Sequence, residues 1–341
     1  MIAASLLRSA LAHWSLGEPV SKAPWARGSR QAPKCRLRSP EGEFILKQRA
    51  PGRDDPLRVG AAHAILAFLA DRGLPVAAPE RARDGSTFLR TQGATLELFR
   101  FVPGLRADGS AGHAACAAQI LARLHDTLRD FPGEVPLPRA TYHAVPDMRG
   151  ILAQARAKIE GDDTSPRDPE RLESACRYLA SAYEDSARRA DDALSTRTPP
   201  DLLHGDWHPG NLIYRAGVVC AVLDFDSVRR GPRVLDVANA ALQFSIERGT
   251  DPDPRIWPVP LRRDVIAAVV DGYDQSAARP LSSAERAALP WLIIEALIHE
   301  SVLPLASSGR FGTVAGAPFL EMVEAKVRWL RPRAGGMRSH T

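Results

Sequence analysis

Hydrophobic and polar positions near the N-terminus first follow a helical period and then a strand-like one. Five apolar residues recur at helical spacing: Ile2, Leu6, Leu7, Leu11 and Trp14. They predict a short amphipathic helix over residues 2–14. The segment 34–48, KCRLRSPEGEFILKQ, predicts a β-hairpin, because SPEG has the serine, proline and glycine preferences of a type I turn.

A longer helix and a second pair of strands are expected after the hairpin. The pattern is helical over 55–72, with Asp55 as N-cap, Pro56 in the first turn and Gly73 at the end. Residues 88–104, FLRTQGATLELFRFVPG, alternate enough to predict two strands. The first hundred residues are therefore predicted to be β-rich with one long helix.

The chain is predicted to be mainly helical after Gly104. The segments 114–128 and 168–194 predict two long helices, and the proline-rich stretch between them predicts a loop. Residues 202–226 predict a strand, a loop and a hairpin, and everything after Asp236 is predicted to be helical.

This change of pattern predicts an α+β protein with two domains. We expect a small β-rich domain at 1–103 and a larger, mainly helical domain at 104–341.

Composition narrows the class of protein. Of 341 residues, 45% are hydrophobic and 25% are charged, which is ordinary for a soluble globular protein. The net charge of +5 comes without a run of five basic residues, so we expect no nucleic-acid partner. The four cysteines form no CxxC pair, and the N-terminus has no typical signal-peptide core. We expect a cytoplasmic protein that does not bind membranes.

A cluster of polar residues, HGDWHPGN at 204–211, carries the candidate chemistry. Asp206 precedes Asn211 by five residues, and Asp224 ends an apolar strand, AVLDFD. A short turn, Arg215-Ala216-Gly217, should pair the strands on either side and place Asn211 and Asp224 at the same end of a hairpin. Amide and carboxylate oxygens suit Mg²⁺ better than zinc, and Asp206 could then accept a proton from a substrate hydroxyl.

The same spacing occurs in the protein-kinase catalytic loop, HRDxxxxN, followed by a metal-binding aspartate. In this chain Gly205 replaces the arginine. The form HGDxHxxN followed by DFD resembles the aminoglycoside phosphotransferase and choline-kinase-like family of small-molecule kinases. Three further segments match that family in order: LARLH at 121–125, LFRFVPG at 98–104 and GPRVLDVANA at 231–240.

The resemblance implies a protein-kinase-like bilobal fold and an ATP-dependent phosphotransferase. Its smaller lobe, 1–103, would bind the nucleotide, and the larger lobe, 104–341, would hold the catalytic loop and the acceptor. Asp206 would be the catalytic base, and Asn211 and Asp224 would hold Mg²⁺. The acceptor would be a hydroxyl of a small metabolite or antibiotic.

The resemblance also implies roles for residues around the nucleotide. Lys47 would contact the α- and β-phosphates, and the segment with Phe99, Phe101 and Val102 would lie along the adenine. His204 and His208 would orient the catalytic loop, and Asp236 would brace it. Asp226 is left open between a second metal contact and a polar turn residue.

The chain departs from the family pattern in two places. Kinases of this fold pair the strand lysine with a glutamate on the next helix, but residues 56–70 contain no acidic residue, and His63 or Ala62 stands near that place. The segment WARGSRQAP has one glycine where a glycine-rich phosphate loop is expected, so Arg27 and Arg30 could supply charge instead.

These departures keep an alternative function open. A nucleotide-binding pseudokinase without turnover would fit them, and a metal-dependent hydrolase using His204, Asp206 and His208 is a third hypothesis. The acceptor is left open among amino sugars, choline, homoserine and other alcohols, as is the oligomeric state. Glu295 and Glu300 could face a cationic acceptor or solvent.

Overall fold

The computed structural model describes residues 2–25, 32–162, 168–194 and 200–335. The chain divides into two compact units. Unit 1 comprises residues 1–108, 123–138 and 209–228, and unit 2 comprises 109–122, 139–208 and 229–341. The domain boundary predicted after residue 103 stays a prediction, and Arg27 and Arg30 lie outside the described residues.

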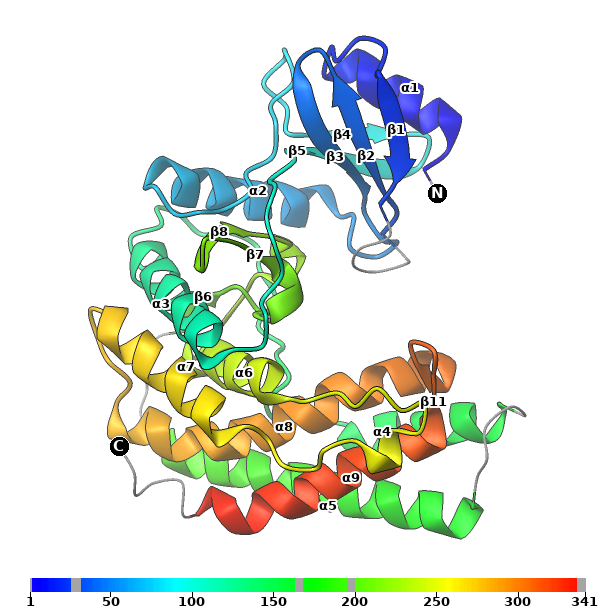
Figure 1. Cartoon of the computed structure of the whole chain (residues 1–341), viewed down its shortest axis with the longest axis vertical. Helices are drawn as coiled ribbons and strands as arrows, with labels where there is room; N and C mark the ends of the chain where they lie inside the picture. Colours follow the sequence, from blue (N-terminus) through cyan, green and yellow to red (C-terminus); the bar gives the residue numbers. More distant parts are fainter. Residues whose placement is uncertain (1, 26–31, 163–167, 195–199, 336–341) are drawn as a thin grey trace. The chain divides into compact units, whose positions relative to one another are not determined.

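Unit 1 is built on a five-stranded sheet with the order β1-β2-β3-β5-β4, in which every pair is antiparallel (Figure 1). The strands are β1 (Ser21–Pro24), β2 (Lys34–Ser39), β3 (Gly42–Gln48), β4 (Phe88–Thr91) and β5 (Ala94–Arg100). A second sheet in this unit pairs β7 (Leu212–Arg215) with β8 (Val218–Val222).

The two faces of the five-stranded sheet have different partners, because successive side chains of a strand point to opposite faces. Leu46 and Leu98 belong to the hydrophobic core that includes Leu6 and Trp14 of helix α1 (Ala4–His13). Their strand neighbours Ile45, Lys47, Glu97 and Phe99 instead line a pocket. The helix predicted at the N-terminus is confirmed, and it covers the apolar face.

The local signals of unit 1 are confirmed. β2 and β3 form the predicted hairpin, with Ser39 opposite Gly42 across a two-residue turn. Helix α2 (Pro56–Asp71) begins after Asp55, whose side chain accepts a hydrogen bond from the Leu57 amide, and Gly73 follows it with φ +74°. A left-handed residue after the last helical turn is the usual place for glycine.

Unit 2 is mainly helical, and helix α8 (Ser283–Ser308) packs against α4, α5, α6 and α9 (Figure 1). These four helices are α4 (Met148–Glu160), α5 (Pro169–Ala193), α6 (Val234–Ser245) and α9 (Gly316–Ala334). The unit also contains helix α7 (Arg263–Ser276) and the paired strands β6 (Asp201–Leu203) and β9 (Arg229–Gly231). Helix α3 (Ala111–Leu128) contributes its first part to unit 2 and its last six residues to unit 1.

Helix α8 is a long and apolar element of unit 2. Among the described helices it alone is long and apolar enough for a membrane span, but 78% of that stretch is buried inside the structure. A capping box begins this helix: the Ser282 side chain accepts from the Glu285 amide, and the Glu285 side chain accepts from the Ser282 amide. Its burial identifies α8 as a core helix.

Two expectations about the larger half of the chain need correction. Helix α4 was not predicted, because the prolines up to Pro146 dominate that region, yet Asp147 caps the helix by accepting from the Gly150 amide. The chain after Asp236 is not wholly helical. Residues 246–262 contain only a single 3-10 turn, and β10 (Arg310–Phe311) and β11 (Val314–Ala315) form a short hairpin.

Candidate active site

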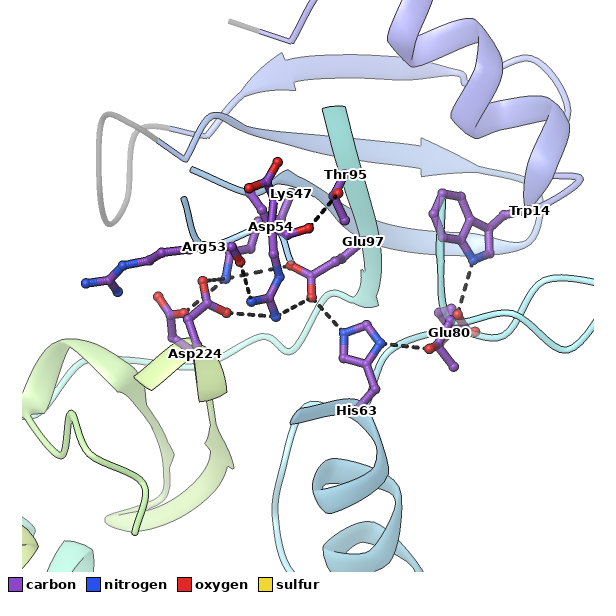
Figure 2. A network of polar contacts seen from close by, with 12 residues as sticks. Trp14, Lys47, Arg53, Asp54, His63, Glu80, Thr95, Glu97 and Asp224 are labelled. Atoms are coloured by element: carbon purple, nitrogen blue, oxygen red, sulfur yellow. Dashed lines mark hydrogen bonds and ion pairs between the residues drawn. The ribbon is translucent and has the colours of Figure 1, made fainter. Parts of the chain in front are cut away.

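Lys47 lies at the centre of an ion cluster in unit 1, although its side chain is only 6% exposed. Its Nζ atom is 2.7 Å from Asp226 Oδ2, 3.0 Å from Asp224 Oδ1 and 3.9 Å from Glu97 Oε2 (Figure 2). Burial alone would lower the pKa of Lys47, but the three carboxylates outweigh it and raise that pKa. Lys47 is therefore a buried, permanently charged ammonium.

Asn211 and Asp224 come together at one end of the β7–β8 hairpin, as the sequence predicted. The Leu223 amide donates to the Asn211 carbonyl at 2.9 Å, and Leu212 lies opposite Val222. Asp224 adopts φ +62° and ψ 66°, a left-handed conformation that is uncommon for a residue other than glycine. Such backbone strain is often found at functional sites.

A pocket of about 150 Å³ in unit 1 brings the predicted nucleotide and metal residues together. Among the described residues, its lining includes those that the sequence proposed for these roles: Lys47, Phe99, Phe101, Val102, Asn211 and Asp224. One part of the lining is apolar, with Ile45 and Leu212, and another carries the charges of the Lys47 cluster. An apolar wall beside a charged one suits a ligand with a flat ring and an anionic group.

The aromatic side of the pocket is ordered by ring contacts. The Trp25 and Phe101 rings meet edge to face at 5.7 Å between centroids, and the Arg36 guanidinium lies 3.9 Å from the centre of the Phe101 ring. Trp25 directly precedes the segment from residue 26 that is not described. The sequence proposed Phe101 for this wall but not Trp25.

Asp226 acts as an ion-pair partner. Besides Lys47, its other oxygen lies 3.1 Å from Arg49 Nη2, and the side chain is 11% exposed. Burial raises the pKa of Asp226, and the neighbouring Asp224 adds to this effect, while Lys47 and Arg49 oppose it. Both oxygens of Asp226 therefore contact cations, Lys47 and Arg49, and a second metal contact at this residue stays a prediction.

Glu97 of β5 is a carboxylate partner of Lys47 that the sequence did not reveal. It is fully buried and lies opposite Lys47 in the β3–β5 register. Arg49 Nη2 lies 2.8 Å from Glu97 Oε1, and His63 Nε2 of helix α2 lies 2.6 Å from the same oxygen. Burial alone would raise the pKa of Glu97, but the His63 hydrogen bond and the charges of Lys47 and Arg49 lower it to about 2.

Lys34 of β2 is a second lysine in the pocket, and the sequence analysis missed it. It lies opposite Lys47 in the hairpin register and lines the same pocket. Burial lowers the pKa of Lys34, and repulsion by Lys47 lowers it further. Like charges directly opposite one another destabilise a sheet, so this pair is best suited to a site that receives an anion. The hairpin turn alone would have revealed the pairing.

The loop that carries Asp206 lies in unit 2, where it is braced as predicted. Asp236 at the start of α6 accepts hydrogen bonds from the amides of His204, at 2.8 Å, and Gly205, at 2.9 Å. Gly205 adopts φ +76°, which explains a glycine where the kinase pattern has arginine. His204 is fully buried and accepts from the Asp206 amide through Nδ1 at 3.2 Å.

His208, the second histidine of the loop, is partly exposed and contacts Asp206. His208 Nε2 lies 3.6 Å from Asp206 Oδ2, and the Asp206 side chain is 39% exposed. Among the described residues, no group of three or more His, Cys, Asp or Glu side chains is arranged to hold a metal ion. The hydrolase hypothesis, which needs such a group from this loop, has no support in these residues.

Glu295 of α8 does not face solvent, and a role towards the acceptor stays a prediction. It is fully buried, and its oxygens lie 3.0 and 3.1 Å from His143 Nδ1, while the Ala144 amide donates to it at 2.9 Å. Glu295 therefore anchors the loop before α4. Glu300 is exposed and contacts its neighbour His299.

Comparison with known sequences agrees with this arrangement. The sequence profile of the phosphotransferase enzyme family matches residues 26–300, so the chain belongs to that family. This confirms the family resemblance seen in the catalytic-loop motif and makes the protein a small-molecule phosphotransferase.

Two relatives in this family are homoserine kinases. A homoserine kinase of Phenylobacterium zucineum is 28% identical over 291 residues, which cover 84% of this chain and 80% of the relative. A homoserine kinase of a Bradyrhizobium strain is 28% identical over 302 residues, covering 87% and 82%. The prediction of an enzyme that phosphorylates an alcohol group of a small molecule is confirmed at this level of class.

Three-dimensional comparison confirms the kinase-like α+β fold. A microcompartment-associated aminopropanol kinase has a TM-score of 0.71 and 17% identity over 99% of both chains. An amicoumacin kinase in complex with AMP-PNP, Ca²⁺ and its substrate has a TM-score of 0.69 and 14% identity, covering 98% of this chain and 94% of that one.

Proposed function

We propose that this chain is an ATP-dependent kinase that transfers the γ-phosphoryl group of ATP to a hydroxyl of a small molecule. Lys47 binds the α- and β-phosphates, Phe99, Phe101 and Val102 lie along the adenine, and Asp206 is the catalytic base. Phosphoryl transfer depends mainly on positioning the reactants and neutralising charge, which these groups can supply. A cytoplasmic location stays a prediction.

One observation carries the proposal. A single pocket of unit 1 is lined by Lys47, Asn211, Asp224 and the aromatic pair Phe99 and Phe101, although these residues come from distant parts of the chain. Lys34 adds a second cation on the same side. The two lysines suit the phosphates of a nucleoside triphosphate, and the apolar wall suits its nucleobase. The oxygens of Asn211 and Asp224 suit the metal ion that accompanies the phosphates.

Asn211 and Asp224 suit a magnesium ion. Both offer oxygen, and Asp224 is the most exposed carboxylate of the Lys47 cluster, at 32%. A site with two protein oxygens is typical of Mg²⁺ that completes its coordination with water and substrate phosphates. When bound there, the ion would neutralise charge on the phosphates. The chain's own contribution is to hold these two oxygens at the end of a rigid hairpin.

Asp206 suits the role of base by its exposure and its support. Its side chain is accessible, while the loop beneath it is fixed by two hydrogen bonds to Asp236. A carboxylate held in this way can orient a substrate hydroxyl and accept its proton as phosphoryl transfer proceeds.

For the acceptor we propose the hydroxyl of an amino acid or amino alcohol, with homoserine first. The support is that the relatives spanning more than four fifths of this chain are homoserine kinases. Relatives under 30% identical can differ in substrate, so amino sugars and choline belong in the same test.

The experiment is an ADP-release assay with ATP and Mg²⁺ against L-homoserine, aminopropanol, choline and amino sugars. We expect one class to give turnover, and Asp206→Ala to lower kcat by about 10²–10⁴-fold while ATP affinity stays within about twofold. Asp192→Asn, an exposed residue of α5, is the matched control. Full activity of the Asp206 variant would contradict the assignment. ATP binding without ADP release from any acceptor would favour the pseudokinase alternative.

A further inference from the structure

Helix α2 approaches the lysine cluster with an imidazole instead of a carboxylate. Residues 56–70 contain no acidic residue, and His63, 4% exposed, faces the sheet from the middle of this helix. His63 Nδ1 lies 2.7 Å from Thr87 Oγ1 and Nε2 lies 2.6 Å from Glu97 Oε1 (Figure 2). Both ring nitrogens therefore have partners, and the ring orientation is fixed.

We propose that Glu97, held by His63 and Arg49, is the positioning residue for Lys47 and replaces the helix glutamate that kinases of this fold use. The carboxylate comes from strand β5, and the helix contributes only the histidine that orients it. This proposal rests on the proposed function, since it assigns a partner to the lysine that binds phosphates.

Glu97 differs from the other two carboxylates near Lys47 in its proposed role and in its position in the chain. Asp224 is the proposed metal ligand, and Asp226 follows it by two residues in the same segment after β8. A carboxylate cannot give the same lone pairs to a metal ion and to an ammonium. Glu97 is fully buried and lies on the strand paired with β3, so it remains beside Lys47 when Asp224 is engaged elsewhere.

The Glu97 carboxylate also has an oxygen available for the lysine. Oε1 is occupied by Arg49 and His63, whereas Oε2 is buried and accepts no hydrogen bond from the described residues. Lys47 Nζ lies 3.9 Å from this oxygen. Moving to a hydrogen-bond distance of about 2.9 Å requires a shift of about 1 Å. The long lysine side chain can make such a shift by rotation, without movement of the sheet.

His63 couples the helix to this arrangement. A contact of 2.6 Å to Glu97 Oε1 leaves little freedom for the carboxylate, and Thr87 fixes the far side of the ring. A displacement of α2 would therefore move Glu97 and change where Lys47 is held. In kinases that carry the glutamate on the helix itself, the coupling is direct. In this chain the coupling between the helix and Lys47 passes through His63 and then Glu97.

The test is a double-mutant cycle on ATP affinity, measured by calorimetry without acceptor. We expect Lys47→Met to weaken ATP binding by about 10–100-fold and Glu97→Gln by about 10-fold, as for hydrogen bonds to charged groups. In the Lys47→Met background, Glu97→Gln should add less than about twofold, because Glu97 acts through the lysine. His63→Asn should show a smaller loss of about threefold that also disappears in that background.

Two controls keep the outcomes distinct. Glu295→Gln makes the same substitution at a fully buried glutamate of unit 2 and should leave ATP affinity unchanged. Glu97→Asp keeps the charge and should recover part of the affinity that Glu97→Gln loses, with folding of each variant checked by circular dichroism.

Equal losses from Glu97→Gln in both backgrounds would overturn the positioning role while leaving the kinase assignment intact. A Lys47→Met variant that binds ATP like the wild type would instead contradict the proposed function.

Discussion

Two fully buried glutamates, one in each unit, are each paired with a histidine, and yet their pKa values are shifted in opposite directions. Glu97 of unit 1 lies 2.6 Å from His63, and Glu295 of unit 2 lies 3.0 Å from His143. The pKa of Glu97 is lowered to about 2, whereas the pKa of Glu295 is raised above its usual value.

The difference comes from the surrounding charges. Burial raises the pKa of both groups, because a carboxylate loses its hydration. Around Glu97 the His63 hydrogen bond, Lys47 and Arg49 outweigh that effect. Around Glu295 the contacts with His143 and the Ala144 amide oppose it, but burial prevails, and repulsion by Asp191 adds to it. Equal burial therefore goes with a lowered pKa where two cations surround the carboxylate, and with a raised pKa where a histidine and one amide contact it.

The largest expected effect is on stability when each glutamate loses its charge. We expect Glu97→Gln to lower the free energy of unfolding by about 3–5 kcal/mol, because it leaves Lys47 and Arg49 partly uncompensated in a buried cluster. Glu295→Gln should cost about 1 kcal/mol or less, because an amide can still accept from Ala144. Urea unfolding of the two variants and the wild type at pH 7 measures both. Equal losses would mean that burial, and not the charge environment, sets the cost.

The sequence predicted the parts of the site that depend on near neighbours. The hairpin turn at SPEG, the Asp55 cap of α2 and the Asn211–Asp224 hairpin each follow from signals within some fifteen residues, and each is present. The position of Lys34 opposite Lys47 could also have been predicted. A turn that pairs Ser39 with Gly42 fixes every other pair of the hairpin, including Lys34 with Lys47.

The partner of Lys47 could not be predicted in the same way. Glu97 lies fifty residues further along, and its register with β3 depends on where the chain returns after α2 and β4. The family pattern directed attention to the helix, where the carboxylate is absent. Only the strand pairing shows that the helix histidine and the strand glutamate together occupy that place.

The second prediction concerns how the contribution of Glu97 to stability changes at acidic pH. Because the pKa of Glu97 is lowered to about 2 from 4.5, its contribution to stability is fully present above pH 4.5 and is lost as the pH falls towards 2. We expect the difference in unfolding free energy between wild type and Glu97→Gln to shrink by up to about 3 kcal/mol over that range. Urea titrations between pH 6 and 2 measure this difference, in which other carboxylates largely cancel.

The contribution of Glu295 to stability should change with pH in the opposite direction. Its raised pKa means that the folded protein binds the proton more tightly, so its contribution falls as the pH rises above 4.5. A difference between wild type and Glu295→Gln that grows in favour of the wild type over this range would contradict the raised pKa of Glu295.

The smallest expected effect is a loss of stability at alkaline pH, and it comes from His143. Burial alone would lower the pKa of His143, but Glu295 at 3.0 Å and Asp191 at 3.1 Å outweigh it and raise that pKa above 6.5. Its protonated form therefore stabilises unit 2 below pH 6.5, and this contribution is lost as the pH rises through the raised value. We expect wild type to lose about 1 kcal/mol relative to His143→Gln between pH 6 and 9. Urea unfolding across this range tests it, and a constant difference would show that the imidazole stays neutral between its two carboxylates.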